Sequence, residues 1–276
     1  MKLTDISQQK KPLDWNVIRS KLHDRAGVIR HHEIHNDIPS TNDLALQQCA
    51  NENTVPAVYF AEQQTAGRGR RGKEWHSPWA QNIYMSLSWH MSVEKIALGG
   101  LSMAMGVVIA RCLRQYGIIA ELKWPNDVMV GHRKIVGILV ESRMRAGGMA
   151  NVVIGVGMNF EMTHDRQTEA LIQQAWTDFS AEYRGDVRVT RSELAGSLLD
   201  YLICGCQEYE CLGLDAFLSE WQSLDICHGR EIDVLVDGVL RSGTMLGVEQ
   251  DGALRVRHGD EEKVYHSAEI SVRLKS

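Results

Sequence analysis

Short apolar runs separated by polar residues predict a chain rich in strands. Residues 57–61 form a continuous apolar run, as in a buried strand, and residues 82–89 alternate polar and apolar side chains, as in a half-buried strand. The turn at residues 130–134 is short, and short turns indicate antiparallel pairing. Further strands are predicted at residues 121–124, 128–130, 135–140 and 152–157.

Helical spacing of apolar residues predicts helices around these strands. Ser40-Thr41-Asn42, followed by Asp43, is typical of a helix N-cap with an acidic first turn. Because strands outnumber helices in the first half, we expect an α+β domain with a mixed or antiparallel sheet and flanking helices, not a doubly wound fold. The expected helices are residues 14–23, 44–48, 101–116, 170–179, 192–209 and 214–221.

The pattern changes after about residue 225. From residue 231 onward, short alternating strands are broken by Asp237-Gly238, Asp251-Gly252 and Gly259-Asp260, and Asp-Gly between apolar runs is a strong hairpin signal. About fifty such residues suit a small β-barrel or sandwich. We therefore expect a large domain over residues 1–225 and a small β domain over residues 226–276.

Composition favours a reduced, cytoplasmic protein. The 276 residues carry a net charge of −5, which argues against broad nucleic-acid binding. Six scattered cysteines show no disulfide-like framework, no signal peptide is evident at the N-terminus, and no apolar run is long enough to cross a membrane. The cluster at residues 31–35 lacks the His-Glu-x-x-His spacing of a metal site and is interpreted as the solvated start of a strand.

Residues 63–75, here called the basic loop, are the most informative stretch. Three arginines and a lysine are interleaved with three glycines, and the stretch ends in Trp75. Glycine lets backbone N–H groups approach a ligand, while arginine suits phosphate and carboxylate oxygens, so the loop could hold a phosphorylated small molecule. A solvated basic turn and a disordered RNA-binding segment are the alternatives. Its place between two strand-like segments favours a loop mounted on a folded scaffold.

Several motifs in order over residues 36–160 resemble the biotin protein ligases. The C-terminal β segment also resembles that family's small terminal barrel, of the Src-homology-3 type. The resemblance implies a catalytic fold similar to class II aminoacyl-tRNA synthetases. The matching motifs are Ser40-Thr41-Asn42, Gln64 with Gly67-Arg68-Gly69-Arg70-Arg71-Gly72 and Trp75, Lys123-Trp124-Pro125-Asn126-Asp127, Lys134-Ile135 with Gly137-Ile138-Leu139 and Glu141, and Gly155-x-Gly157-x-Asn159.

The resemblance implies an ATP-dependent ligase that forms biotinyl-5′-AMP and then transfers biotin to a lysine of a biotin carboxyl carrier domain. Fixed cations would offset the repulsion between the biotin carboxylate and the phosphate. Lys134 would bridge these two groups, and Arg70 and Arg68 would hold the phosphoryl oxygens. Arg71 would meet the triphosphate tail or close the loop, with Gly69 beside it. The basic loop is expected to be mobile when empty and ordered over the ligand, because water hydrolyses an acyl-adenylate.

Other residues are assigned by the same resemblance. Ser40, Thr41, Asn42 and Gln64 would hydrogen-bond the ureido ring of biotin. Asn159 and Arg191 would lie on the nucleotide side, with Trp176 against adenine. Asp127 would help to hold Mg²⁺ or would pair with Lys123. Gly137 and Gly155 would either leave room for the ligand or mark a bulge or close strand packing.

Three rival functions and two further expectations accompany this interpretation. A lipoate or octanoate ligase shares the fold, a non-catalytic biotin- or nucleotide-sensing regulator would bind without turnover, and an RNA-binding protein would use the Arg-Gly loop. Because 39 residues precede Ser40, we expect no DNA-binding helix-turn-helix domain and a monofunctional protein. An exposed sheet edge could support a homodimer, at a position that the sequence does not locate.

Overall fold

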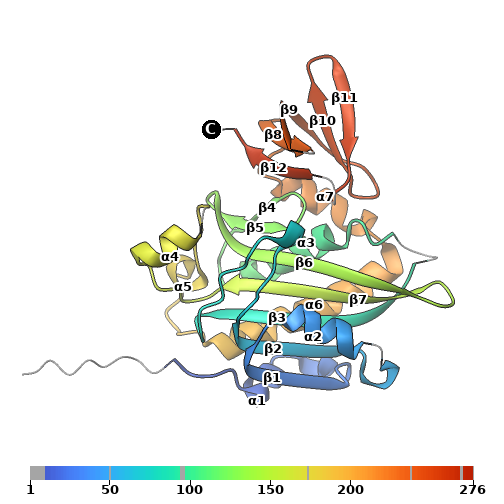
Figure 1. The fold of residues 1–276 in the computed structure, drawn as a ribbon. Helices are drawn as coiled ribbons and strands as arrows, with labels where there is room; N and C mark the ends of the chain where they lie inside the picture. Colours follow the sequence, from blue (N-terminus) through green and yellow to red (C-terminus); the bar gives the residue numbers. More distant parts are fainter. Residues whose placement is uncertain are drawn as a thin grey trace, which may run out of the picture.

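The computed structural model describes residues 10–49, 51–93, 97–172, 174–236, 238–267 and 270–275. Its centre is a seven-stranded mixed sheet in the order β1-β2-β3-β7-β6-β5-β4 (Figure 1). The β1–β2 pair is parallel and the other pairs are antiparallel. The strands are β1 (His31–Ile38), β2 (Ala57–Gln64), β3 (Asn82–Ser92), β4 (Glu121–Lys123), β5 (Asp127–Val130), β6 (Arg133–Arg145) and β7 (Met149–Asn159).

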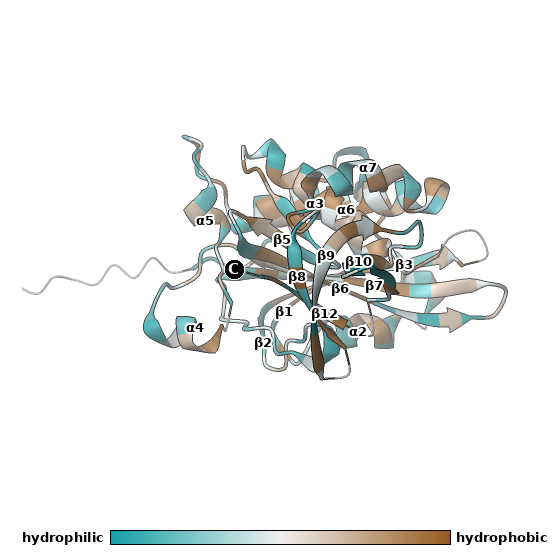
Figure 2. Ribbon diagram, turned by 90° about the horizontal axis from the view of Figure 1, so that it is seen from above, coloured by the Kyte–Doolittle hydropathy of each residue, from teal (hydrophilic) through white to brown (hydrophobic). Residues whose placement is uncertain are grey.

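Helices cover both faces of this sheet. The long helices α3 and α6 pack together against one face, with α7 beside α3, and α2 lies on the opposite face (Figure 2). The α+β prediction is thus confirmed. The helices are α1 (Trp15–Ser20), α2 (Thr41–Gln48), α3 (Leu101–Gln115), α4 (Arg166–Leu171), α5 (Phe179–Glu182), α6 (Arg191–Leu212) and α7 (Asp215–Leu224), with 3₁₀ turns η1 (His23–Gly27), η2 (Glu52–Thr54) and η3 (Arg70–Gly72).

The alternation along β3 separates the core from the site. Ile83, Met85 and Leu87 are fully buried in the large core on the side of α3 and α6. Ser86 points to the other face, where its hydroxyl reaches the first turn of α2. The period of two that predicts a half-buried strand therefore also places a buried hydroxyl beneath α2.

One expectation about local structure is corrected and another is confirmed. The helix expected over residues 170–179 is instead two short helices, α4 and α5, separated by a segment in which Trp176 bridges to Lys134 on β6. A tertiary contact thus interrupts the apolar periodicity. Residues 31–35 begin the edge strand β1 and are half-buried or exposed, in agreement with the interpretation as a solvated strand start.

The second sheet contains five antiparallel strands in the order β11-β10-β9-β8-β12, as expected of a small barrel-like domain. Two of the three expected hairpin turns lie between strands as predicted, and β8 pairs with β9 as well, although Asp237 is outside the described residues. Within the described part of the chain, no helix is both long and apolar enough to cross a membrane. The strands are β8 (Glu231–Val236), β9 (Val239–Val248), β10 (Leu254–His258), β11 (Glu261–Tyr265) and β12 (Ile270–Leu274).

Buried contacts join the two sheets. The indole Nε1 of Trp124, after β4, donates to the carbonyl of Gly252 at 3.0 Å. The backbone N–H of Ile226 donates to the carbonyl of Leu122 at 3.0 Å. Asp225 lies at this junction, where one carboxylate oxygen accepts from the N–H of Cys227 at 2.9 Å and the other is buried without a partner among the described residues. Burial raises the pKa of Asp225 to about 6.

This carboxyl group is expected to make stability depend on pH. A folded-state pKa of about 6 above the ordinary value of 3.8 means that the folded protein binds the proton more tightly, so Asp225 lowers stability as pH rises through that interval. The free energy of unfolding should therefore fall more between pH 4 and pH 7 in the wild type than in Asp225→Asn, a difference that urea denaturation measures. Parallel pH profiles for the two proteins would contradict this expectation.

Candidate functional site

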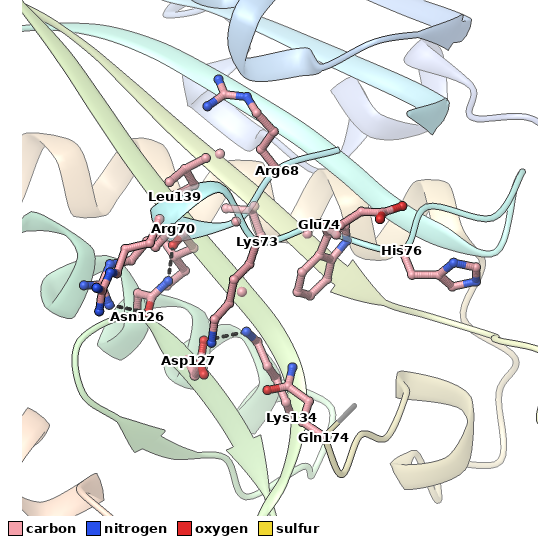
Figure 3. Close-up of a pocket in the computed structure, with 18 of the residues that line it drawn as sticks. Arg68, Arg70, Lys73, Glu74, His76, Asn126, Asp127, Lys134, Leu139 and Gln174 are labelled. Atoms are coloured by element: carbon pink, nitrogen blue, oxygen red, sulfur yellow. Dashed lines mark hydrogen bonds and ion pairs between the residues drawn. The ribbon is translucent and has the colours of Figure 1, made fainter. Parts of the chain in front are cut away.

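A cavity of about 890 Å³ opens between the basic loop, the strands β5 to β7 and the terminal strand β12. Figure 3 shows Lys134 beside Asp127, and Arg70 beside Asn126, in this cavity. It gathers residues from both sheets and from segments far apart in sequence. The sequence-predicted residues that line it are Ser40, Thr41, Asn42, Gln64, Arg68, Gly69, Arg70, Arg71, Asp127, Lys134, Gly137, Gly155, Asn159 and Trp176.

The N-terminus of α2 provides a buried polar cluster. Ser40 caps the helix, because its hydroxyl accepts from the N–H of Asp43 at 3.3 Å. The N–H and hydroxyl of Thr41 donate to the side-chain oxygen of Gln64 at 2.8 and 3.1 Å. Asn42 is 4% exposed, and its side-chain oxygen lies 2.6 Å from the hydroxyl of Ser86. The cluster presents fixed donors and acceptors to the cavity. A few polar groups placed in this way orient small polar ligands in protein pockets.

The glycines of the floor make room for side chains of the site. Gly137 on β6 and Gly157 on β7 are cross-strand partners. A Cβ atom at either glycine would lie within 2.7 Å of the indole ring of Trp75. A Cβ atom at Gly155 would lie 2.2 Å from the side-chain oxygen of Asn42. The basic loop thus returns Trp75 onto the bare backbone of the sheet, and Asn42 packs beside it in the same way.

Lys134 has a defined position on the cavity wall. Its Nζ lies 2.6 Å from a carboxylate oxygen of Asp127 and 5.2 Å from the centroid of the Trp75 ring. Its backbone N–H and carbonyl bond to the backbone of Ala175 and Thr177, each at 3.0 Å, which fixes the start of β6. Of the two roles considered for Asp127, the structure shows pairing, but with Lys134 instead of Lys123.

The three arginines of the basic loop have different environments. Arg68 pairs with two carboxylates, those of Asp43 on α2 and Glu141 on β6. The hydrogen bond to Asp43 is the main cause of the raised pKa of Arg68. In Figure 3 its side chain points away from Asp127 and Lys134.

Arg70 and Arg71 instead reach neutral oxygens. Arg70 donates to the side chain of Asn126 at 3.3 Å and to the backbone carbonyl of Ser267. Arg71 donates to the hydroxyl of Ser271 on β12 at 3.2 Å. Burial lowers the pKa of Arg70, which means that its positive charge is poorly solvated. Neutral acceptors do not neutralise a guanidinium group, so both charges can attract an anion.

The tip of the loop also has a constrained backbone. Arg71 adopts a φ of 56° and Gly72 a φ of 69°, values in the left-handed region that glycine adopts easily and arginine rarely does. This turn directs Arg70 and Arg71 toward the small β domain and returns the chain to Trp75. A side chain at Gly67 would collide with the hydroxyl of Ser77 at 2.7 Å, so that glycine permits a close backbone approach.

Asn159 and Trp176 lie near Lys134, at the cavity. The side-chain nitrogen of Asn159 donates to the carbonyls of Thr177 at 2.9 Å and Lys134 at 3.4 Å. The indole of Trp176 stacks on the imidazole of His164, with 4.4 Å between ring centroids. Asn159 thus supports the segment that holds Lys134, and one face of Trp176 is already covered by His164.

The structure does not bring Arg191 to the cavity. Its side chain is 6% exposed, pairs with the fully buried carboxylate of Glu62 and donates to the carbonyls of Asn82 at 3.0 Å and Lys11 at 2.9 Å. These bonds tie the segment before α1 to β2, β3 and α6. The prediction of a nucleotide contact for Arg191 therefore finds no support here, because its guanidinium group is engaged elsewhere.

Sequence reasoning missed several cavity residues. Lys73 lines the cavity, and burial lowers its pKa, with a smaller contribution from the neighbouring charge of Arg273. Lys73 lies in the basic loop and could have been counted among the available cations. Arg273 and Ser271 lie on β12, about 200 residues away in sequence, and only the packing of the two sheets brings them to the site. Ser86, which is fully buried and contacts Thr41 and Asn42 from behind the cavity wall, carried a signal only as a polar residue within the alternation of β3.

No group of three histidine, cysteine, aspartate or glutamate side chains in the described residues is arranged to hold a metal ion. At the edge strand β1, Glu33 bonds to His31 and His35, each at 2.7 Å, and the bond to His31 is the main cause of the lowered pKa of Glu33. These three side chains satisfy one another. Asp127 and Glu74 are the carboxylates among the described residues that line the cavity, and Glu74 points away from Lys134 in Figure 3.

Two family models match the chain. The biotin/lipoate A/B protein ligase family matches residues 35–159, and the biotin protein ligase C-terminal domain matches residues 227–273. The bifunctional ligase/repressor BirA of Escherichia coli is 34% identical over 237 residues, which cover 86% of this chain and 72% of that protein. The chain therefore belongs to the biotin/lipoate A/B protein ligase family, and within it to the biotin protein ligases.

A curated relative and a solved structure extend the comparison. The biotin–[acetyl-CoA-carboxylase] ligase of Paracoccus denitrificans is 28% identical over 84% of this chain and 96% of its own length. The biotin protein ligase of Aquifex aeolicus, solved with biotin and ATP, superimposes with a TM-score of 0.72 at 21% identity, covering 89% of this chain and all of that one. The latter similarity shows the fold.

Proposed function

We propose that this protein activates biotin with ATP and transfers it to a lysine of a biotin carboxyl carrier domain. One observation carries the proposal: a single cavity joins the polar cluster at the start of α2 to the cations Lys134, Arg70 and Arg71. That arrangement suits a ligand with a polar ring at one end and a reacting carboxylate beside phosphates at the other. The names of the relatives, and the biotin and ATP bound by the Aquifex aeolicus protein, support the same pair of substrates.

The first step joins two anionic groups. A biotin carboxylate oxygen attacks the α-phosphorus of ATP, the bond from that phosphorus to the bridging oxygen breaks, and pyrophosphate leaves. Fixed positive charge aimed at the developing phosphoryl charge is the main means of lowering such a barrier. Lys134 is positioned for this by Asp127 and Trp75 and would contact the carboxylate and the α-phosphate. Arg70 and Arg71 would exchange their neutral acceptors for phosphate oxygens.

The second step uses the mixed anhydride. The carrier lysine amine attacks the acyl carbon, loses a proton, and releases AMP as the amide bond forms. The protein's contribution is to hold the adenylate and keep water away until the lysine arrives. The basic loop and Trp75 cover the floor of the cavity and can serve this purpose.

The remaining substrate contacts follow the geometry. The cluster of Ser40, Thr41, Asn42 and Gln64 would bind the ureido ring. Trp176 and Asn159 lie near Lys134, on the side proposed for the nucleotide, and the free face of Trp176 would meet adenine.

Mg²⁺ is a further part of the proposal, with Asp127 as its protein ligand. Mg²⁺ commonly takes one or two carboxylates, with phosphates and water completing its shell, so a single aspartate fits. The metal would neutralise triphosphate charge, and Asp127 would then be shared between Mg²⁺ and Lys134.

The proposed setting is a cytoplasmic enzyme whose protein partner is the carrier domain of a biotin-dependent carboxylase. Residues 1–225 would form the catalytic domain and residues 226–276 the small β domain, a division that the two family models support. A homodimer through a sheet edge remains a prediction.

Pyrophosphate release tests the first step. In a single turnover, the protein should release pyrophosphate from ATP when biotin and Mg²⁺ are present. It should release none when lipoate replaces biotin. A burst with lipoate alone would favour the lipoate ligase of the same fold. Binding of biotin without any pyrophosphate would favour a non-catalytic sensor.

Enlarging the floor tests the role of Trp75. In Gly157→Ala the new methyl group would lie 2.5 Å from the indole, so the ring must move. Overpacking of this kind typically costs about 1–3 kcal/mol, and we expect biotin binding to weaken about tenfold, measured by calorimetry. Gly27→Ala is the matched control, because no atom lies within 4 Å of its added methyl group. Unchanged biotin affinity in Gly157→Ala would show that the position of Trp75 does not matter for the ligand.

A further inference from the structure

Arg68 differs from the other cations of the basic loop. Its guanidinium group contacts Asp43 and lies 3.4 and 3.5 Å from the two carboxylate oxygens of Glu141. One carboxylate lies on α2 and the other on β6, two elements that contribute other residues to the cavity. An arginine already matched by two carboxylates attracts a phosphate far less than one bonded to neutral oxygens.

The base of the loop is fastened to the same wall by backbone bonds. The N–H of Thr65 donates to the carbonyl of Ile38 at 3.0 Å, and that of Ala66 donates to the carbonyl of Pro39 at 2.9 Å. Arg68 continues this row of contacts to Asp43. The contacts therefore run along the segment that contains the polar cluster.

Glu141 connects Arg68 to that cluster. Its second carboxylate oxygen accepts from the side-chain nitrogen of Asn42 at 2.8 Å. The oxygen of the same amide lies 2.6 Å from the hydroxyl of Ser86. One carboxylate thus fixes the orientation of Asn42 and also contacts the loop.

We infer that Arg68 is a positioning residue that fastens the basic loop closed through Asp43 and Glu141, and does not bind the phosphates. Its link through Glu141 makes closure of the loop depend on the orientation of Asn42, and hence on what the polar cluster binds. For the ligand side, the inference rests on the proposed function. Arg70 and Arg71 would remain the phosphate-binding arginines.

Three variants separate fastening from phosphate binding. Arg68→Gln removes the cation, and the double variant Asp43→Asn with Glu141→Gln removes its two partners. The side-chain oxygen that Glu141→Gln retains can still accept from Asn42. Because both variants remove the same ion pairs, they should have the same effect, and the triple variant should add nothing further. Arg133→Gln, which breaks an exposed pair with Glu182 outside the loop, is the matched control.

Trypsin cleavage after Arg70, followed by mass spectrometry without any ligand, is the first readout. Partly exposed ion pairs contribute modestly, so we expect cleavage to accelerate about three- to tenfold in all three variants and not in the control. This readout does not depend on the proposed function.

The second readout is AMP formed with biotin and ATP in the absence of a carrier. The same variants should release AMP about three- to tenfold faster by hydrolysis, while the single-turnover rate of pyrophosphate release changes less than about twofold. A raised KM for ATP in Arg68→Gln, with an unchanged KM in the double variant, would overturn the inference. It would show that Arg68 binds the phosphates of ATP. Unchanged cleavage in every variant would also overturn it. If the wild type formed no AMP with biotin, the proposed function would fail, while the cleavage result would still decide the role of Arg68.

Discussion

Replacing Lys134 by alanine is expected to slow pyrophosphate release about 10²–10³-fold, the effect usual for loss of one preorganised group that stabilises developing charge. Asp127 and Trp75 hold the ammonium group of Lys134 in place, so the alanine variant loses a cation that is already positioned. Single-turnover release of pyrophosphate measures the loss directly.

The control for this result is Lys263→Ala, a lysine on β11 that pairs with Glu261 away from the cavity. It should retain the wild-type rate. If the rate of pyrophosphate release fell less than about threefold in Lys134→Ala, with the fold intact by circular dichroism, Lys134 would have no part in the reaction.

Replacing Arg191 by methionine is expected to lower the free energy of unfolding by about 3–5 kcal/mol, because Glu62 would keep a buried carboxylate without its partner. Methionine preserves most of the volume of the arginine side chain, so the change in the free energy of unfolding comes mainly from the lost positive charge. Urea denaturation measures the change, and the double variant with Glu62→Gln should recover part of it. Arg133→Met is the control, since its pair with Glu182 is exposed and should be worth less than about 1 kcal/mol.

The same variant tests the position of Arg191. Because its guanidinium group is bonded away from the cavity, the KM for ATP should be unchanged in the folded protein. If the folded variant instead had a KM for ATP about tenfold higher, Arg191 would have to contact the nucleotide.

Local patterns predicted much of the fold. The alternation of β3 and the short turns indicated the strands. Every neighbouring pair in the sheet order β2-β3-β7-β6-β5-β4 is antiparallel, as expected. The parallel β1–β2 pair was not predicted, because a stretch as polar as residues 31–35 shows no buried face. The helix expected over residues 170–179 failed because residues there pair with Lys134 on β6, a contact that no local pattern contains.

The site was predicted unevenly for a similar reason. The motifs correctly placed Lys134, Arg70 and the polar cluster in one cavity. Lys134 lies at the start of β6, Arg70 follows β2, and the cluster lies at the start of α2, so all three belong to elements of one sheet and its covering helix. Arginine identity alone did not separate the ion-paired Arg68 from Arg70 and Arg71, because their partners come from α2, β6 and β12. The sequence did not separate the buried ion pair of Arg191 from a nucleotide contact, because both require the same residue type.

Mass spectrometry of a biotin carboxyl carrier domain incubated with this protein, biotin, ATP and Mg²⁺ tests the central claim most directly. We predict a gain of one biotinyl group on one lysine, absent without ATP and strongly reduced in Lys134→Ala. A parallel reaction with lipoate should leave the carrier unchanged. An unmodified carrier with biotin, from protein that is folded and binds biotin, would contradict the account.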